Sequence, residues 1–327
     1  MAPLLKVDGL RIEFPTRRGV LVAVDDISFS IDKGEVLGVV GESGAGKSIT
    51  GAAVIGLLEP PGRIARGNIR FEGRQVNGLP QEAMRRIRGA KIGAIFQDPL
   101  TSLNPLYSIG QQLVETITTH TDLSPARARA RALELLNEVG IPAAERRIDS
   151  YPHEFSGGMR QRVVIALAIC ANPRLIIADE PTTALDVSIQ AQIIALLRRL
   201  CHEHRTAIML ITHDMGVIAE MSDRVAVMYA GRIAEIGPLR DVVKTPRHPY
   251  TAGLMDSIPR VGEEKEKLSH IRGSMPRLQE IPPGCPFHPR CPETFDRCRE
   301  ERPDLMPTGH PNQDASCWKF AGTVRHG

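Results

Sequence analysis

The stretch GESGAGKS, residues 41–48, constrains the fold of this chain more than any other. It matches the pattern G-x-x-x-x-G-K-[ST], follows the apolar run EVLGVV, and precedes a segment that predicts a helix beginning at Lys47. Glycines let such a loop curl until its backbone N–H groups point at phosphate oxygens, while Lys47 can reach the β- and γ-phosphates and Ser48 can bind Mg²⁺. Strand, loop and helix together therefore predict a nucleotide phosphate site at the positive end of the helix.

A second motif, LIIADEP, places two acids at the end of an apolar run. The run predicts a buried strand, which would deliver Asp179 to the shell of the Mg²⁺ ion directly or through water. Glu180 follows it and could polarise an attacking water as a general base. Two solvated acids at a strand end are the alternative, which the phosphate-binding loop disfavours.

Apolar periodicity along residues 1–245 indicates strands that alternate with helices. We expect strands within 4–40 and at 67–76, helices at 47–58, 111–139 and 160–170, a strand at 174–181, a helix at 189–204, a strand at 206–214, and a hairpin at 223–237 that turns at Ala230 and Gly231. This order predicts an α/β fold with a mostly parallel sheet.

From about residue 245 the character of the chain changes, because proline becomes dense and cysteines accumulate. We therefore expect one domain at 1–245 and an extension at 246–327, with the charged segment GEEKEKL at 262–268 as a linker. The formal net charge of +3 is too small to indicate nucleic acid or a membrane surface as a partner. No apolar run is long enough to span a membrane, and the expected location is the cytosol.

Four of the six cysteines, namely Cys285, Cys291, Cys298 and Cys317, lie in the extension with the spacing C-x5-C-x6-C-x18-C. A reducing cytosol disfavours disulfides, and four thiolates suit zinc or an iron–sulfur cluster. The C-x2-C pairs of zinc knuckles are absent, and proline follows the first two cysteines, as occurs around iron–sulfur clusters. The cysteine pattern therefore leaves three possibilities for these residues: an iron–sulfur cluster, a zinc ion, or thiols without a ligand. Elsewhere Cys170 is expected in the core, and Cys201, His202 and His204 at a helix end are expected to be capping or solvated groups rather than metal ligands.

With FSGGMRQR at residues 155–162, the chain resembles the nucleotide-binding subunits of ABC transporters. The motifs of that family appear here in the family order from residue 41 to residue 213. They are, after the phosphate-binding loop, the Q-loop at Gln97 in IFQDP, the signature motif at Ser156, Gly157 and Gly158, the acids Asp179 and Glu180, the D-loop from Ala184 to Asp186, and the switch histidine His213 in ITHD. Met159 stands where glutamine is common in the signature, which leaves the backbone donors unchanged.

The resemblance implies a P-loop ABC-type ATPase core, with an antiparallel β subdomain, an α-helical insertion at about 98–165 and a small irregular cysteine-containing extension. It implies that two ATP molecules lie between two such domains, so that each site is divided over a dimer. The ATP-binding residues would be Gly41, Glu42, Ser43, Gly44, Ala45, Gly46, Lys47, Ser48 and Ile49, and from the opposite subunit Ser156, Gly157, Gly158 and Asp186. Mg²⁺ would be held by Ser48, Gln97 and Asp179, with Glu180, His213 and Gln97 in catalysis. Phe14 is the candidate for stacking on adenine, and a core phenylalanine at a strand edge is the alternative.

The segment RHPYTAGLMDSIP from residue 247 is similar to the extension of oligopeptide and dipeptide importer ATPases, where the cysteine pattern resembles one that holds a 4Fe–4S cluster. The resemblance implies a bacterial peptide importer with a second homologous ATPase subunit, two membrane permeases and an extracytoplasmic binding protein, assembled at the cytoplasmic face of the membrane. The same subunit in a nickel or glutathione importer is one alternative. A soluble ABC ATPase acting on nucleic acid or ribosomes is another, disfavoured because tandem domains and a long coiled coil are absent. A non-hydrolysing regulatory module is disfavoured by Glu180 and His213.

Overall fold

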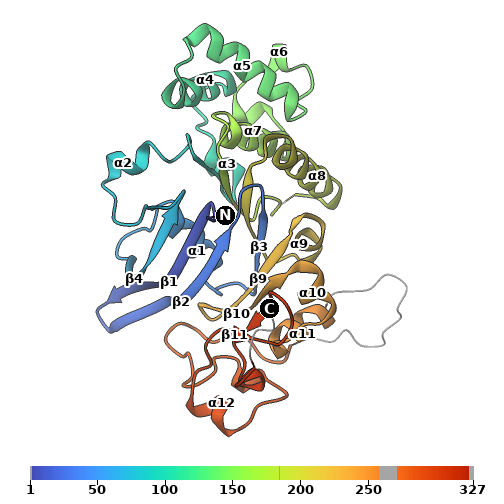
Figure 1. Ribbon diagram of the computed structural model, residues 1–327. Coiled ribbons are helices and arrows are strands. Elements are labelled where there is room, and N and C mark those ends of the chain that lie inside the picture. Colours follow the sequence, from blue (N-terminus) through green and yellow to red (C-terminus); the bar gives the residue numbers. More distant parts are fainter. Residues whose placement is uncertain (1, 184, 258–270, 324–327) are drawn as a thin grey trace. The chain divides into compact units, whose positions relative to one another are not determined.

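The computed structural model describes residues 2–183, 185–257 and 271–323, which form two compact units (Figure 1). Unit 1 comprises residues 1–4, 31–35 and 78–210, and unit 2 comprises residues 5–30, 36–77 and 211–327. The units thus alternate along the chain, and unit 2 holds both the phosphate-binding loop and the extension. The domain boundary near residue 245 stays a prediction, and the expected linker at 262–268 lies outside the described residues.

Unit 2 contains the expected antiparallel sheet, in the strand order β2-β1-β4-β5. Its strands are β1 (Leu5–Thr16), β2 (Gly19–Ile31), β4 (Arg63–Phe71) and β5 (Arg74–Gln75). Alternate residues are buried along β1, first Leu5 and Val7 and then, after an irregularity in the pairing between Asp8 and Arg11, Leu10 and Ile12. This periodicity explains why the sequence of the N-terminal region predicts strands.

A second set of strands in unit 2 carries the loop and the extension. Strand β3 (Val36–Val40) pairs in parallel with β9 (Arg224–Tyr229), which forms a hairpin with β10 (Arg232–Pro238). The hairpin turns at Ala230 and Gly231, both with positive φ, as the sequence predicts. Strands β12 (Asp314–Ala315) and β11 (Met306–Pro307) continue the set beyond β10, so the extension is built into this sheet.

The helices of unit 2 follow its strands and lie around them (Figure 1). They are α1 (Lys47–Val54), α9 (Met215–Met221), α10 (Leu239–Lys244), α11 (Pro249–Asp256) and α12 (Asp296–Glu300). Helix α1 begins at Lys47 as expected and ends four residues before the predicted 58, because Gly56 adopts a positive φ.

Unit 1 contains the helical part of the fold around parallel strands. Its strands are β6 (Ile92–Ile95) and β7 (Leu175–Asp179), with β8 (Ala207–Thr212) crossing the division between the units. Its helices are α2 (Gln81–Arg85), α3 (Pro99–Ser102), α4 (Ile109–His120), α5 (Pro125–Glu138), α6 (Ala144–Arg147), α7 (Gly157–Ile169) and α8 (Val187–His204). Helices α4, α5 and α6 lie together in the insertion expected at 98–165 (Figure 1).

One expected helix is wrong as a continuous element. Residues 111–139 form two helices, because α4 ends in the extended residue Thr121 and α5 starts at Pro125 behind the extended Ser124. Proline is accepted in a first helical turn but disfavours helical geometry in the residue before it. The apolar periodicity runs through both helices and hides this break.

Among the described residues, no helix is both long enough and apolar enough to cross a membrane.

Candidate nucleotide-binding site

The glycines of the phosphate-binding loop stand where a side chain would collide with the strands of unit 2. A Cβ atom at Gly41 would lie 2.2 Å from the carbonyl oxygen of Met228 in β9. Gly46 precedes α1 with φ 97°, and a Cβ atom there would lie 2.9 Å from the carbonyl oxygen of Ala23. Close packing and left-handed geometry therefore both demand glycine in this loop.

Lys47 holds its charge inside the loop. Its side chain is buried, and Nζ donates to the carbonyl oxygens of Gly41 at 2.8 Å and Glu42 at 3.1 Å. Because the ammonium group binds the loop at its first residues, Lys47 closes GESGAGKS into a ring behind the first turn of α1. That Lys47 binds phosphate stays a prediction.

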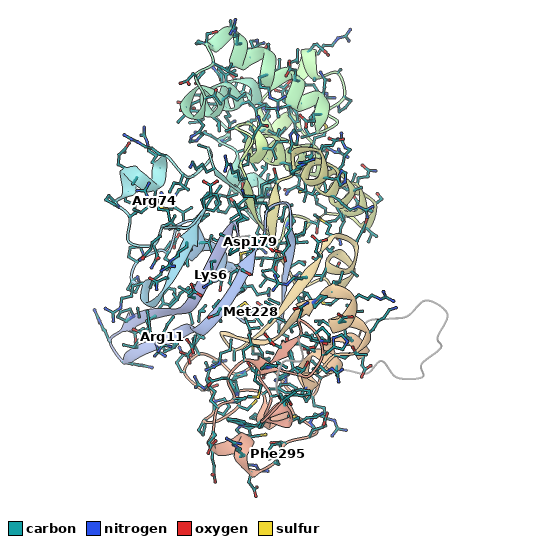
Figure 2. All side chains as sticks on the ribbon, viewed as in Figure 1. Lys6, Arg11, Arg74, Asp179, Met228 and Phe295 are labelled. Carbon is teal, nitrogen blue, oxygen red and sulfur yellow. The ribbon has the colours of Figure 1, made fainter. Side chains whose placement is uncertain are left out.

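Gln97 and Glu180 meet at the end of two neighbouring strands of unit 1. Ile95 of β6 pairs with Ala178 of β7, and the strands are parallel, so the residues after both strands emerge at one edge. There Gln97 Nε2 donates to the Glu180 carboxylate at 3.2 Å, and Thr183 Oγ1 donates to the same carboxylate oxygen at 2.8 Å. Asp179, the last residue of β7, directly precedes this group (Figure 2).

Glu180 has a backbone φ of 47°, which a residue other than glycine rarely adopts. Such geometry costs free energy and is found where a side chain must be aimed in one direction. Two hydrogen-bond donors from separate segments then hold the carboxylate in that direction. The side chain that the sequence predicts as general base is thus held by two hydrogen bonds at this edge.

The signature residues form an exposed helix N-terminus in unit 1. Ser156 is the N-cap of α7 and accepts a hydrogen bond from the Met159 N–H at 3.4 Å. Gly157 and Gly158 make up the first turn, and a Cβ atom at Gly158 would lie 2.8 Å from the Ile189 side chain. The N–H groups of a first turn have no partner within their helix, and the helix dipole favours an anion there.

The remaining predicted residues occupy the ends of elements. Asp186 is the N-cap of α8, where hydrogen bonds from the Ile189 N–H and then the Ser188 hydroxyl lower the pKa of its carboxyl group. His213 is exposed and follows β8, and Ala184 lies outside the described residues. Phe14 is half-buried, and its ring packs so closely on Gly62 that a Cβ atom there would lie 2.8 Å from the ring.

The predicted site residues thus fall into two groups. Phe14, the loop 41–49 and His213 belong to unit 2, whereas Gln97, Ser156–Gly158, Asp179, Glu180 and Asp186 belong to unit 1. Within unit 1 the structure brings Gln97 and Glu180 into direct contact.

Sequence reasoning missed two residues that contact the loop. The Glu42 backbone N–H donates to Tyr250 Oη at 3.0 Å, and the Glu42 carboxylate accepts from Arg290 Nη1 at 3.0 and 3.2 Å. Tyr250 lies in α11 and Arg290 stands just before Cys291, both in the extension. Nothing in the sequence links positions that are 208 and 248 residues apart.

The four extension cysteines are near one another and form no disulfide. The Cys285 N–H donates to the Cys298 carbonyl at 2.8 Å. Burial, with a smaller contribution from the neighbouring thiols Cys298, Cys317 and Cys291, raises the pKa of Cys285 to about 11. Burial also raises the pKa of Cys291 and of Cys317. A bound cation would lower these pKa values, because it stabilises thiolates.

The spacing of the extension thiols does not distinguish zinc from a cluster. Among the described cysteines, no three Sγ atoms lie within 4.8 Å of one another. A tetrahedral zinc ion with Zn–S bonds of about 2.3 Å requires thiolates about 3.8 Å apart. Both metals therefore stay proposals for this site.

The other cysteines and histidines behave as core or surface groups. Cys170 and Cys201 are buried, and burial raises their pKa to about 11 and about 12. His204 Nε2 lies 2.7 Å from the Glu138 carboxylate, close to Glu203. Arg131 and Arg199 pair with these two acids, so the cluster is already compensated by cations.

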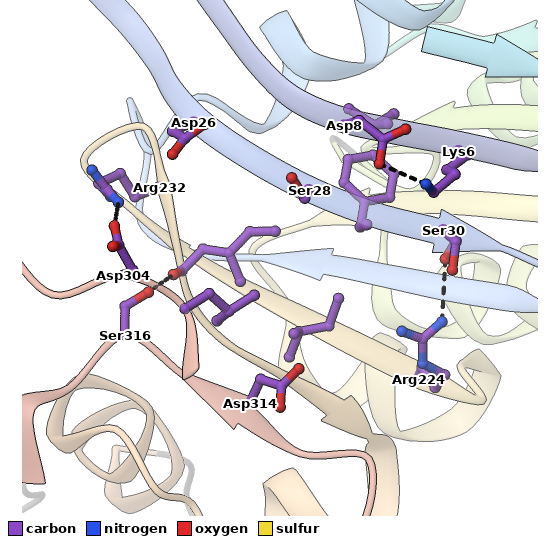
Figure 3. A pocket seen from close by; sticks show the side chains of 15 residues that line it. Lys6, Asp8, Asp26, Ser28, Ser30, Arg224, Arg232, Asp304, Asp314 and Ser316 are labelled. Atoms are coloured by element: carbon purple, nitrogen blue, oxygen red, sulfur yellow. Dashed lines mark hydrogen bonds and ion pairs between the residues drawn. The ribbon is translucent and has the colours of Figure 1, made fainter. Parts of the chain in front are cut away.

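A pocket of about 460 Å³ lies elsewhere in unit 2, between β1, β2, β9, β10 and the extension (Figure 3). Its charged side chains are paired, Lys6 with Asp8 at 2.9 Å and Arg232 with Asp304 at 3.6 Å. No residue of the phosphate-binding loop is among those that line it. It is a feature separate from the loop.

Comparison with known proteins agrees with this geometry. Residues 24–183 match the family described as ABC transporter, and residues 234–298 match the family described as oligopeptide/dipeptide transporter, C-terminal region. The oligopeptide transport ATP-binding protein OppD of Salmonella typhimurium is 48% identical over 97% of this chain and 93% of its own length. The dipeptide transport ATP-binding protein DppD of Escherichia coli is 47% identical over 92% of each.

Solved structures support the same fold. A dimeric ATP-binding cassette in a post-hydrolysis state, bound to ADP and Pi, is 28% identical with a TM-score of 0.65, and the match covers 72% of this chain and 99% of that chain. The α/β ATPase core that the sequence predicts is thereby confirmed. The chain belongs to the ABC transporter family, among the ATP-binding proteins that carry the oligopeptide/dipeptide transporter C-terminal region.

Proposed function

We propose that this chain is the ATP-hydrolysing subunit of a bacterial importer for dipeptides or oligopeptides. Its relatives are named for oligopeptide and dipeptide transport, which supports peptides as the transported substrate. The hydrogen-bonded group of Gln97, Glu180 and Thr183 carries the hydrolytic part of the proposal, because it presents a fixed carboxylate beside Asp179 at the end of β7. A binding module without hydrolysis would have no use for a general base held in strained geometry.

In this proposal each site residue has the role that the family resemblance gives it. Lys47 and the loop N–H groups bind the β- and γ-phosphates, and Ser48, Gln97 and Asp179 hold Mg²⁺. Glu180 accepts a proton from the attacking water as the γ-phosphoryl group passes to that water, leaving ADP and inorganic phosphate. His213 donates a hydrogen bond to the γ-phosphate. Catalysis is then positioning and electrostatic stabilisation.

We propose further that a second, homologous ATPase subunit completes the site. The exposed first turn of α7 at Ser156, Gly157 and Gly158 has the donors and the dipole to bind the γ-phosphate held by the partner, with Asp186 beside it. ATP binding would close the two subunits and hydrolysis would reopen them. Phe14 is proposed to stack on adenine.

The proposed assembly includes two membrane permeases and an extracytoplasmic peptide-binding protein, with this chain at the cytoplasmic face of the membrane. Exposed apolar side chains in the helical insertion, Leu100 at 63% and Leu106 at 80%, offer contacts to a permease. No nucleic acid is proposed as a partner.

Uptake of labelled substrates tests the transported cargo. Cells that lack this chain are expected to lose uptake of a labelled tripeptide and to recover it when the chain is restored, while the Glu180→Gln variant restores nothing. Labelled nickel and labelled glutathione serve as parallel substrates. Loss of nickel or glutathione uptake with unaltered tripeptide uptake would contradict the peptide assignment and leave the ATPase assignment standing.

We propose that Cys285, Cys291, Cys298 and Cys317 hold a 4Fe–4S cluster, with zinc as the alternative. Four thiols within one short, proline-rich extension, with proline after the first two cysteines, support a cluster that orders the extension. When bound, it would supply structural cross-linking, and the four residues would act as its thiolate ligands.

Metal analysis of anaerobically purified chain tests the cluster. We expect about four iron and four sulfide per chain, both lost from a Cys298→Ser variant. Cys170→Ser is the matched control, because that cysteine is buried in unit 1 and is outside the extension sequence, and it should leave the iron content unchanged. A colourless protein with stoichiometric zinc would refute the cluster.

A further inference from the structure

We propose that Tyr250 and Arg290 are positioning residues for the phosphate-binding loop, and that through them the cysteine-bearing extension sets the affinity of the loop for ATP. The inference rests on the proposed nucleotide-binding function of the loop. It assigns to the extension a direct part in that function.

Glu42 is the residue at which the two parts meet. Its N–H donates to Tyr250 Oη at 3.0 Å, and its carboxylate accepts from Arg290 Nη1 at 3.0 Å. Its carbonyl oxygen in turn accepts from Lys47 Nζ at 3.1 Å. One residue therefore joins the extension to the lysine that is to bind phosphate, with no intervening side chain.

Arg290 is held firmly enough to act as an anchor. Its side chain is only 8% exposed, and it also donates to the carbonyl oxygens of Arg272 at 2.9 Å and Gly273 at 3.3 Å. The guanidinium carbon lies 5.7 Å from the centre of the Tyr229 ring. A buried arginine with fixed partners positions a carboxylate far better than a mobile surface arginine does.

Tyr250 is the second anchor. It is fully buried and packs in an edge-on geometry on Tyr229, with ring centres 4.7 Å apart. The extension also approaches the loop at Gly44, where a Cβ atom would lie 3.1 Å from Met275 Cε. The extension therefore lines the loop at two of its eight residues.

The turn that carries Arg290 is bounded by two of the cysteines. The His288 N–H donates to the Cys285 carbonyl at 3.0 Å, the Arg290 N–H to the Phe287 carbonyl at 2.9 Å, and the Cys291 N–H to the His288 carbonyl at 3.3 Å. Residues 285–291 thus form one compact, hydrogen-bonded turn. A change at the thiols that loosens this turn releases Arg290 and with it Glu42.

Calorimetric titration of the purified full-length chain with Mg²⁺–ATP tests the inference. We expect Arg290→Ala to weaken ATP binding by about tenfold and Tyr250→Phe, which removes only the acceptor oxygen, by roughly threefold. Arg277→Ala, an exposed arginine of the same extension, is the matched control and should bind as the wild type does. Arg290→Lys should lie between wild type and Arg290→Ala, because lysine keeps the charge but not the fork of donors.

The same variants are measured again in a chain that also carries Glu42→Ala. This comparison distinguishes a positioning role of Arg290 and Tyr250 from a general loss of structure. Arg290 acts on the Glu42 side chain, so Arg290→Ala should have less than about a twofold further effect there. Tyr250 acts on the backbone N–H, so Tyr250→Phe should keep its effect. Equal, additive losses for both variants in both backgrounds would overturn the assignment. In steady-state hydrolysis the KM for ATP should rise in Arg290→Ala while kcat at saturation holds.

Cys291→Ser tests the link to the thiols in the same titration. It should weaken ATP binding in the wild type and have less than about a twofold effect once Arg290 is alanine. The same loss in both backgrounds would overturn the link. If the wild-type chain binds ATP and every variant binds it with the same affinity, the inference is overturned and the proposed function stands. If the wild-type chain binds no ATP, the proposed function is contradicted as well.

Discussion

Replacing Glu180 with glutamine is expected to reduce ATP hydrolysis by about 10²- to 10⁴-fold while ATP binding persists. Glutamine has the size of glutamate and can keep the contacts at 3.2 Å to Gln97 and 2.8 Å to Thr183. It cannot accept the proton of the attacking water at neutral pH. Phosphate release at saturating Mg²⁺–ATP measures the effect.

The trapped complex gives a second readout. If closure needs ATP and reopening needs hydrolysis, as proposed, the variant should accumulate as an ATP-bound dimer in size-exclusion chromatography once its partner subunit is present. Glu82→Gln, an exposed glutamate of α2 in the same unit, is the control and should hydrolyse ATP as the wild type does. Undiminished turnover in Glu180→Gln would remove the proposed general base.

Replacing Glu235 with alanine is expected to lower the free energy of unfolding by roughly 3–5 kcal/mol. Glu235 is fully buried in β10, and its carboxylate accepts from the N–H groups of Arg247 at 2.9 Å and His248 at 2.8 Å. Gln313 Nε2 also donates to it, at 2.7 Å. Alanine would leave these donors buried without an acceptor.

These contacts attach the extension at both ends. They hold the chain before α11, where burial lowers the pKa of His248 to about 4, so that its neutral Nδ1 accepts the Tyr250 N–H at 3.0 Å. They also hold Gln313, next to β12. Urea unfolding at pH 7 measures the loss, and Glu220→Ala on the exposed face of α9 should change stability by less than about 0.5 kcal/mol. A loss below that same limit in Glu235→Ala would show that the carboxylate is dispensable.

Local chemistry made part of the candidate site predictable. Glu180 follows an apolar run that predicts a buried strand, whereas Gln97 was indicated only by the family resemblance, because the four-residue strand β6 before it was not predicted. The parallel pairing of β6 with β7 places the carboxyl ends of both strands at one edge. Ser156 and Asp186 carry N-cap chemistry that needs only their own helices. The strained φ of Glu180 and the donor Thr183 are invisible in sequence, because both depend on how the chain turns after β7.

Longer-range features were beyond prediction. The break between α4 and α5 is signalled by Pro125, but a shared apolar period conceals it. The extension was expected to be a separate appendage, yet Ala315 pairs with Glu235 and Ser316 Oγ donates to the Ile233 carbonyl at 2.7 Å, as Figure 3 shows for Ser316. Strands of two residues, such as β11 and β12, are too short to show a periodic pattern in the sequence.

The amino-acid sequence by itself determined the chemistry of this protein: the phosphate-binding loop, the two acids, the helix caps and the four thiols each depend on residues that are neighbours along the chain. Only the tertiary structure decided what the extension contacts, because the hydrogen bond between Glu42 and Arg290 spans 248 positions along the chain. Short-range patterns specify local backbone and side-chain chemistry, whereas such a meeting depends on the whole fold. The loop GESGAGKS could be recognised from the sequence, whereas Tyr250 and Arg290, which contact its second residue Glu42, could not.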